Sequence, residues 1–343
     1  HNLGDDALLQ VLASQIPADW NLVVTARDAD AVRSLVAGVA TVNRRSLSET
    51  LSSLNRVDAL VLGGGSLLQD GTSFKSLFYY LLLLWIARFR GIPTLLWGQG
   101  LGPLRRRVSR TLVKHTLKGV SSVSWRDPRS LGQAQRWGLR VPMVMGPDPV
   151  WCHPSPAWCG GNRLILCWRP TPLLNRIGWR ILLEAVDQFS SSGHSEVIWL
   201  AFHQEQDGSL WDELRTQNLI PEGLRQRSVQ MQAESLEQVQ SLFSEASLVI
   251  AMRLHALILA ATGGCPTAAL SYDPKVQAAA QLAGLPCSDL QDPLNLDQLI
   301  GQWQLSLKAH QDQSQIDQLK SAARVHQTTL VEELGKLSVQ SSA

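Results

Sequence analysis

Short apolar runs alternate with helix-sized segments along this sequence, and this alternation constrains the fold more than any other feature. The runs are continuously apolar, which is typical of strands buried on both faces of a parallel sheet. They lie at 21–26, 58–62, 94–97, 120–125, 141–145, 163–168, 196–202, 247–252 and 266–270. Helices between such strands cover both faces of the sheet. We therefore predict an α/β protein with doubly wound, Rossmann-like domains.

One interruption in the alternation suggests where the chain divides. Residues 147–162 contain four prolines, two cysteines and two glycines, which is typical of a linker. A length of 343 residues also favours two domains, at roughly 100–200 residues each. We predict domains at 1–150 and 163–293, a linker at 151–162, and C-terminal helices at 294–343 that pack along the outside. Ligands of such folds bind beyond the carboxyl ends of the strands, so we expect a cleft between the facing domains.

Composition excludes several classes of protein. The formal charge of +2 gives no global electrostatic basis for nucleic-acid binding. The longest apolar run, at 77–87, is shorter than the roughly 20 residues of a membrane span and predicts a buried helix. Five cysteines without a secretory signal favour a reducing compartment, and hence the cytoplasm. The chain begins without Met inside a polar motif, so we expect it to be N-terminally incomplete.

Glycines follow two of the predicted strands. Gly63, Gly64 and Gly65 end one strand and precede a predicted helix, and Gly98 and Gly100 follow the next. Such glycines let backbone N–H groups approach a ligand and form an anion-binding nest. Neither the dinucleotide-binding nor the P-loop spacing is present. Tight packing of the strand against its neighbours is the alternative explanation.

Acidic and basic residues occupy two further positions of interest. Asp5 and Asp6 precede an apolar helix, where either could cap the helix or serve as a carboxylate that accepts a proton. Arg126 ends the strand 120–125, which places it at the ligand edge of the sheet. The alternative for Arg126 is a surface arginine paired with Asp127.

The most informative segment follows the strand 247–252. Arg253 ends this strand, and His255 falls in the first turn of the next helix, where a cation opposes the helix dipole unless an anion compensates it. After the next strand, Asp273 is a predicted N-cap and Lys275 lies just inside the helix. Asp273 is the only acid between residues 246 and 287. We therefore expect a site for a small anion that carries phosphate and carboxylate groups.

Metal and serine-hydrolase chemistry have little support. Cys152, His153, Cys159 and Cys167 lack the paired spacing of zinc ligands, so we predict no metal site. No G-x-S-x-G segment is present.

Taken together, these motifs resemble the polysaccharide pyruvyl transferase family, and specifically its CsaB type. The resemblance covers most of the chain up to about residue 283, and Arg253-Leu254-His255 and Tyr272-x-x-Lys275 are its most specific parts. The other matching segments are Asn2-x-Gly4-Asp5-Asp6-Ala7, Gly63-Gly64-Gly65-Ser66, Gly98-Gln99-Gly100-x-Gly102-Pro103 and Arg126-Asp127. Family members begin with a Gly-rich strand end that this chain lacks.

The resemblance implies a GT-B-like fold and transfer of pyruvate from phosphoenolpyruvate to a sugar as a cyclic ketal. It implies that Asp5 is the acceptor base, that His255 is the general acid, and that Arg126, Arg253 and Lys275 bind phosphoenolpyruvate. Members of this type act on cell-wall polysaccharide precursors, often N-acetylmannosamine, and the pyruvyl group helps to anchor S-layer proteins. No cofactor is implied, and a lipid-linked acceptor would bring the enzyme to the inner face of the membrane.

Two other functions stay open at this point. A GT-B glycosyltransferase with a nucleotide-sugar donor would share the fold, although the Glu-x7-Glu pair usual in retaining members is absent between residues 246 and 287. A non-catalytic sugar- or metabolite-binding module is the second alternative. Neither the acceptor sugar nor the oligomeric state follows from the sequence.

Overall fold

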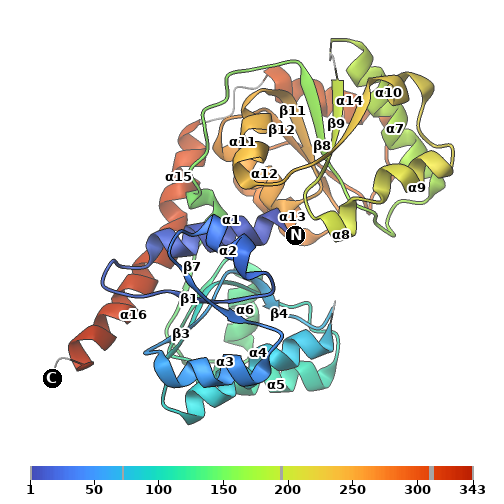
Figure 1. Ribbon diagram of the computed structural model, residues 1–343. Helices are drawn as coiled ribbons and strands as arrows, with labels where there is room; N and C mark the ends of the chain where they lie inside the picture. The colour runs from blue at the N-terminus through green and yellow to red at the C-terminus, as the bar shows by residue number, and fades with distance from the viewer. Residues whose placement is uncertain (1, 72, 194–195, 309–312, 342–343) are drawn as a thin grey trace. The chain divides into compact units, whose positions relative to one another are not determined.

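A computed structural model describes residues 2–71, 73–193, 196–308 and 313–341 (Figure 1). The chain divides into two compact units. Unit 1 comprises His1–Ala7 and His153–Lys320, and unit 2 comprises Leu8–Cys152 and Ser321–Ala343.

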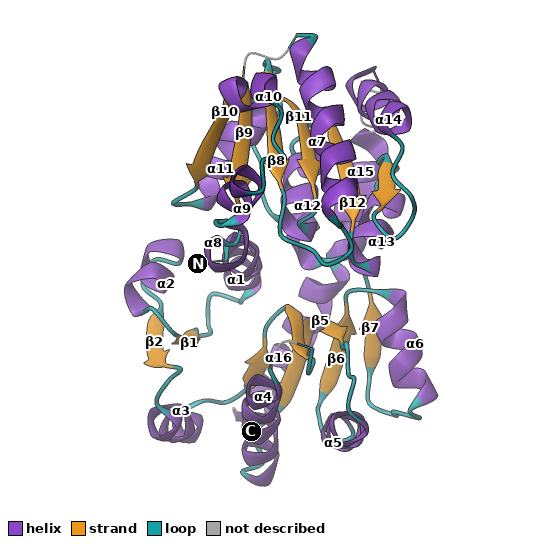
Figure 2. Ribbon diagram, turned by 90° about the vertical axis from the view of Figure 1, so that its right-hand side faces the viewer, coloured by secondary structure: helices purple, strands orange, loops and turns teal. Residues whose placement is uncertain are grey.

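Unit 1 is built on a six-stranded sheet in which every pairing is parallel. The strand order is β10 (Ser228–Gln232), β9 (Glu196–Ala201), β8 (Arg163–Cys167), β11 (Ala246–Ala251), β12 (Thr267–Ser271) and β13 (Cys287–Asp289). Figure 2 shows helices on both sides of this sheet. They are α7 (Arg176–Ser191), α8 (Gln204–Asp207), α9 (Leu210–Thr216), α10 (Glu222–Arg227), α11 (Leu236–Ser244), α12 (Leu254–Thr262), α13 (Pro274–Leu282), α14 (Leu296–Lys308) and most of α15 (Gln313–Ala323).

Unit 2 contains a five-stranded parallel sheet and a separate parallel pair of strands. The larger sheet has the order β3 (Leu60–Leu62), β5 (Thr94–Leu101), β6 (Ser122–Trp125) and β7 (Met143–Met145), with β4 (Gly65–Leu68) also beside β5, and the pair is β1 (Val23–Ala26) with β2 (Ala40–Asn43). Its helices are most of α1 (Leu3–Gln15), α2 (Ala29–Leu35), α3 (Leu47–Ser53), α4 (Phe74–Phe89), α5 (Arg107–Leu117), α6 (Pro128–Arg136) and α16 (Val325–Ser341). Two parallel sheets confirm the predicted α/β class.

Hydrophobic runs predicted most of the large elements. Helix α4 covers the predicted apolar run and buries Leu77, Leu81 and Leu84, while α12 has the bounds expected from the sequence. Four strands were not predicted: β2, β4, β10 and β13. Three of the five residues of β10, SVQMQ, are polar, which is typical of a strand at the edge of its sheet.

The units differ from the predicted domains at three places. The first residues of α1 pack with unit 1, because the N–H of Leu3 donates to the Phe202 carbonyl at 3.3 Å. Most of the predicted linker, from His153 on, also belongs to unit 1, where the N–H of Trp158 donates to the Gly263 carbonyl at 2.8 Å. The C-terminal helices are divided between the units and fill their cores, with Trp303 of α14 1 % exposed in unit 1 and His326 of α16 fully buried in unit 2.

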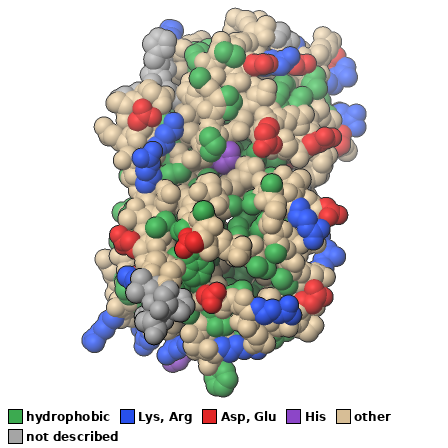
Figure 3. Space-filling view, turned by 60° about the vertical axis from the view of Figure 1, so that its left-hand side comes forward, with side chains coloured by type: hydrophobic (Ala, Val, Ile, Leu, Met, Phe, Trp, Pro, Cys, Tyr) green, Lys and Arg blue, Asp and Glu red, His purple; other side chains and the backbone are tan. Residues whose placement is uncertain are grey.

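Two surface properties bear on partners. Within the described residues, no helix is both long and apolar enough to cross a bilayer. Figure 3 shows one face on which Lys and Arg side chains are interspersed with Asp and Glu, as the small net charge leads one to expect.

Candidate active site

Two polar helix starts follow neighbouring strands of unit 1. Arg253 is the N-cap residue of α12, which places His255 in the first turn, and Asp273 caps α13 by accepting a hydrogen bond from the N–H of Lys275 at 3.0 Å. Strands β11 and β12 pair directly, so both helix starts lie at the same edge of the sheet. These local structures confirm the predicted helix starts. The Lys275 ammonium lies 3.9 Å from Asp273, and its side chain is 41 % exposed.

A buried carboxylate holds Arg253 in place. The Arg253 Nε atom donates to Asp207 at 3.0 and 3.1 Å, and Nη2 donates both to Asp207 and to the Gln206 side chain. The Asp207 side chain is fully buried, and Arg253 is 14 % exposed. Asp207 therefore provides a second counter-charge in addition to Asp273. The sequence analysis did not identify it, because Asp207 lies on α8, 46 residues before Arg253. Within the described residues, Arg253 Nη1 makes no hydrogen bond, so this nitrogen can still donate to a ligand.

The N-terminal motif packs directly against His255. Asn2 caps α1, because its side chain accepts from the N–H of Gly4 at 3.1 Å and its carbonyl accepts from the N–H of Asp5 at 3.0 Å. A methyl group on Gly4 would overlap Nδ1 of the His255 ring. Two motifs about 250 residues apart in sequence therefore meet within unit 1.

Asp5 and Asp6 occupy different environments in the first turn of α1. Asp5 is exposed and does not cap the helix, so the capping interpretation is wrong for this residue. Asp6 is half-buried, and burial together with the nearby charge of Asp5 raises its pKa to about 7. Asp5 was also expected to lie in a different domain from the donor cluster, but both belong to unit 1.

The site contains polar residues that the sequence analysis did not select. His203 follows β9 and pairs with Asn2, and burial followed by the positive charge of Arg253 lowers its pKa. Arg169 follows β8, donates to the Tyr272 hydroxyl at 3.3 Å, and stacks on that ring. Among the described residues, no carboxylate lies within ion-pair distance of Arg169. Both residues stand just beyond a strand, the same signal that selected Arg253.

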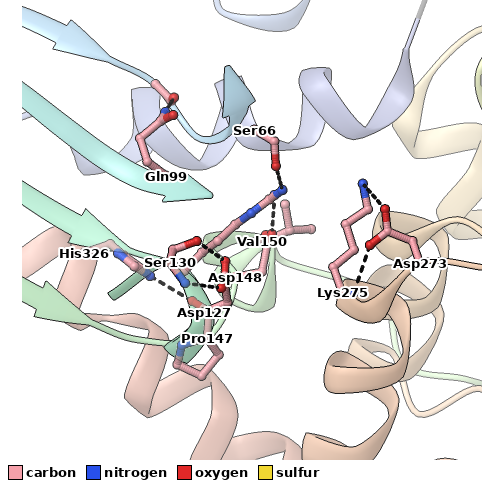
Figure 4. Close-up of polar contacts among 12 residues, drawn as sticks. Ser66, Gln99, Asp127, Ser130, Pro147, Asp148, Val150, Asp273, Lys275 and His326 are labelled. Atoms are coloured by element: carbon pink, nitrogen blue, oxygen red, sulfur yellow. Dashed lines mark hydrogen bonds and ion pairs between the residues drawn. The ribbon is translucent and has the colours of Figure 1, made fainter. Parts of the chain in front are cut away.

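Arg126 forms a buried cluster in unit 2. Its Nη1 donates to Asp148 and its Nη2 donates to the Ser66 hydroxyl, both at 2.8 Å (Figure 4). Asp148 also accepts from the N–H of Val150 at 3.0 Å. Asp127 instead caps α6 through the N–H of Ser130, so the alternative Arg126–Asp127 pair is wrong. The side chains of Arg126 and Asp148 are each 6 % exposed. Asp148 is thus committed to an ion pair.

The glycines of unit 2 lie in different elements from those predicted. Gly63 and Gly64 connect β3 to a second strand, β4, which begins at Gly65, so the three glycines do not lead directly into a helix. Gly98 and Gly100 lie inside β5, which is longer than predicted. Glycine is required at both positions, because neighbouring side chains occupy the space that a Cβ would fill.

Gly63, Gly98 and Gly100 contact side chains of neighbouring residues. The side chain of Gln99 donates to the Gly63 carbonyl, and the N–H of Gly98 donates to the Ser124 hydroxyl at 2.9 Å. A methyl group on Gly100 would lie 2.8 Å from the Ser66 oxygen and 3.0 Å from Arg126 Nε. Glycine at position 100 therefore makes room for the Arg126 cluster.

Potential metal ligands do not gather in the described part of the chain, where no group of three or more His, Cys, Asp or Glu side chains is suitably arranged. Cys152, His153, Cys159 and Cys167 lie in the described residues, and all five cysteines are free thiols.

Substitution of Gly4 tests the contact with His255. We expect Gly4→Ala to lower the free energy of unfolding, because a crowded packing site costs about 1–3 kcal/mol while alanine returns at most about 1 kcal/mol in a helix. Gly301→Ala is the matched control, since Gly301 lies in α14 with nothing within 4 Å of its added methyl group. Urea unfolding of both variants measures the difference. A Gly4→Ala protein as stable as the control would contradict the contact.

The raised pKa of Asp6 predicts a dependence of stability on pH. An aspartate in an unfolded chain titrates near pH 4, whereas Asp6 in the folded protein titrates near 7. Between these values the folded state binds more protons, so its stability falls as the pH rises from about 4 to about 7. We expect Asp6→Asn to be less sensitive to pH over this interval in urea unfolding. An unchanged dependence on pH would show that Asp6 titrates normally.

Comparison with solved structures identifies proteins that share this fold. The chain is similar to a putative UDP-N-acetylglucosamine 2-epimerase from Listeria monocytogenes, with 13% identity, 94% of this chain and 89% of that chain covered, and a TM-score of 0.61. It is also similar to HepE from Anabaena in complex with UDP, with 14% identity, coverage of 99% and 96%, and a TM-score of 0.57. A glycosyltransferase from Rickettsia africae gives 9% identity, coverage of 98% and 95%, and a TM-score of 0.62. At these identities the likeness shows the fold alone, a GT-B-type pair of Rossmann-like units.

Sequence comparison gives the family. No curated protein sequence matches significantly. The family model for polysaccharide pyruvyl transferase matches residues 2–274, a span that contains the Asn2 to Asp6 motif, the Arg126 cluster and the Arg253 to His255 motif. With most of its length matched by this model, the chain belongs to the polysaccharide pyruvyl transferase family.

Proposed function

We propose that this protein transfers pyruvate from phosphoenolpyruvate to a sugar, forming a cyclic ketal and releasing inorganic phosphate. The observation that carries the proposal is the contact between Gly4 and His255. This contact brings a carboxylate-bearing helix start to an imidazole that is two residues from a fixed arginine. Family membership supplies the reaction class.

The donor would be bound by cations at the edge of the unit 1 sheet. Phosphoenolpyruvate carries a phosphate next to a carboxylate, and an arginine with a free Nη1 together with a partly exposed lysine suits these groups. Arg253 and Lys275 take this role in our proposal. Arg126, which the resemblance also assigned to the donor, lies in unit 2 with its terminal nitrogens bonded to Asp148 and Ser66, and it has no role in this donor site.

The reaction needs one acid and one base. His255 donates a proton to the methylene carbon of the enol, while Asp5 accepts the proton of the first sugar hydroxyl as its oxygen attacks the adjacent carbon. The carbon–phosphate oxygen bond then breaks, and the cations stabilise the departing phosphate. The second hydroxyl attacks the resulting oxocarbenium ion and closes the ketal, and its proton passes to the phosphate. In this scheme the reaction requires no metal or other cofactor.

The acceptor is a saccharide of a cell-wall or exopolysaccharide precursor in this proposal. A lipid-linked acceptor would bring the protein to a membrane surface without a membrane-spanning helix. The sugar and its hydroxyl pair are to be found by incubation with phosphoenolpyruvate and a panel of acceptors, followed by mass spectrometry.

Thermal unfolding tests the donor. We expect phosphoenolpyruvate to raise the melting temperature and high salt to weaken the effect, because the ligand is held by charges. UDP-sugars are the comparison, since a glycosyltransferase would share this fold. Stabilisation by UDP-sugars but not by phosphoenolpyruvate would refute the proposed donor. Stabilisation without product on any acceptor would favour a binding module.

Replacement of Arg253 by lysine tests the proposed role of this arginine in binding phosphoenolpyruvate. Arg253→Lys keeps the positive charge but removes the planar guanidinium group. In the wild type, one edge of this group donates to Asp207, and Nη1 stays available to a ligand. A charge-assisted hydrogen bond contributes roughly 1.5–3 kcal/mol, so we expect the affinity for phosphoenolpyruvate to fall about tenfold or more. Isothermal titration calorimetry measures this. Wild-type affinity would show that the Arg253–Asp207 pair serves only the fold.

A further inference from the structure

A cavity of about 240 Å³ lies within unit 1, beside the candidate site. It opens at the carboxyl ends of β8, β9 and β10, between these strands and the helices α8 and α9. None of the roles proposed above uses it. Its inner wall includes Trp168, Trp199 and Trp211, and Gln204 lines it from α8. Gln230 and Gln232, both exposed on the edge strand β10, lie at its mouth.

Three indole rings give the cavity a continuous aromatic wall. Trp199 meets Trp168 with ring centroids 5.5 Å apart and meets Trp211 at 5.0 Å, in both cases nearly edge to face. Each of the three side chains is less than 9 % exposed. A wall of this kind favours a ligand with an apolar face.

Polar atoms of the lining lack partners. The Trp168 Nε1 donor and the Gln204 Oε1 acceptor are both buried and make no hydrogen bond within the described residues. Buried polar atoms of this kind are normally satisfied by the protein, by water or by a ligand. Both atoms have almost no accessible surface, so the polar residues that line the cavity for a ligand are Gln204, Gln230 and Gln232.

The charge of the lining and the volume of the cavity limit which ligands can bind. Asp207 is the one charged residue of the lining, and its carboxylate is already neutralised by Arg253. A neutral ligand is therefore favoured. A cavity of ~150 Å³ holds a benzene ring, so about 240 Å³ suits a single six-membered ring with substituents. A pyranose fits this description, because its C–H faces are apolar and its hydroxyls both donate and accept hydrogen bonds.

We propose that this cavity binds one pyranose ring of the acceptor saccharide. The identification of the ring as part of the acceptor rests on the proposed function. Asp207 provides the connection, because the same residue lines the cavity and bonds to Arg253. A sugar in the cavity would therefore lie one side chain away from the cationic cluster. Its reacting hydroxyls belong to this ring or to the ring linked to it.

Binding of methyl pyranosides without donor tests the cavity. The methyl glycosides of N-acetylmannosamine, glucose and galactose are titrated in the absence of phosphoenolpyruvate, with tryptophan fluorescence and saturation-transfer NMR as readouts. We expect at least one to bind, and Gln204→Leu to weaken it by about 3–10-fold through the loss of one or two hydrogen bonds. Gln188→Leu, at an exposed glutamine of α7 outside the cavity, should bind like the wild type. Met231→Trp, which fills the cavity, should abolish binding.

The outcomes separate this inference from the proposed function. No binding of any pyranoside to the wild type, or binding that ignores both Gln204→Leu and Met231→Trp, overturns the inference even if phosphoenolpyruvate stabilises the protein. Uridine binding that depends on Gln204, in place of pyranoside binding, also overturns it and indicates a nucleobase pocket. Pyranoside binding with the expected variant effects, but no response to phosphoenolpyruvate, supports a sugar site and refutes the proposed donor.

Discussion

Replacing His255 with glutamine should lower turnover by about 10²–10⁴-fold while leaving phosphoenolpyruvate bound. General acid catalysis contributes about this much, and glutamine cannot deliver a proton near neutral pH. The side chain of glutamine still fills the space against Gly4, so the packing between α1 and α12 should survive. Turnover is measured as phosphate release with an active acceptor, and donor binding is measured by thermal shift.

The control for this variant is His115→Gln, because His115 is an exposed histidine on α5 of unit 2. It should retain wild-type turnover. If His255→Gln binds the donor and turns over at the wild-type rate, His255 is not the acid. His203 would be the next residue to test, because it follows β9 of the same sheet and pairs with Asn2.

Local sequence patterns predicted the parts of the site that are local in the structure. The apolar run 247–252 followed by a helical segment gave β11, Arg253 at its end, and His255 in the first turn of α12. Asp273-Pro274-Lys275 gave the start of α13 because the capping preferences of Asp and Pro act within a few residues.

These local patterns could not predict contacts between residues that are far apart in the sequence. Asp207 lies on a four-residue helix, and nothing nearby in the sequence marks it as the partner of Arg253. The docking of Asn2 on His203 likewise joins segments about 200 residues apart, which is why the first residues were assigned to the wrong unit. Gly98 and Gly100 suggested a loop, since glycine is rare in strands, but close packing by Pro149 and Arg126 explains them inside β5.

Asp5 and Asp6 are the two candidates for the acceptor base, and their environments differ. Asp5 is exposed at the start of α1, whereas Asp6 is half-buried with a pKa raised to about 7. Asp148 is not available as a base, because it is held in a buried pair with Arg126. An exposed carboxylate can reach a sugar hydroxyl that enters from solvent, and this favours Asp5.

Asp5→Asn should therefore lower turnover by about 10²–10⁴-fold. Because Asn2 already caps the helix, the substitution removes no cap, and stability should stay close to that of the wild type. Donor affinity should also be unchanged, since Asp5 makes no donor contact in the proposed mechanism. Asp30→Asn, an exposed first-turn aspartate of α2 in unit 2, controls for the loss of a surface charge near a helix start.

Comparison with Asp6→Asn completes the test. If Asp5 is the base, Asp6→Asn should retain most of the turnover and should mainly alter the dependence of stability on pH. The reverse pattern, with Asp5→Asn active and Asp6→Asn inactive, would assign the base to the half-buried carboxyl. That result would also predict a loss of turnover below pH 7, because protonation of Asp6 near that value would remove the base. A weakened affinity for phosphoenolpyruvate in Asp5→Asn would instead place this carboxylate at the donor, so the two measurements together decide its role.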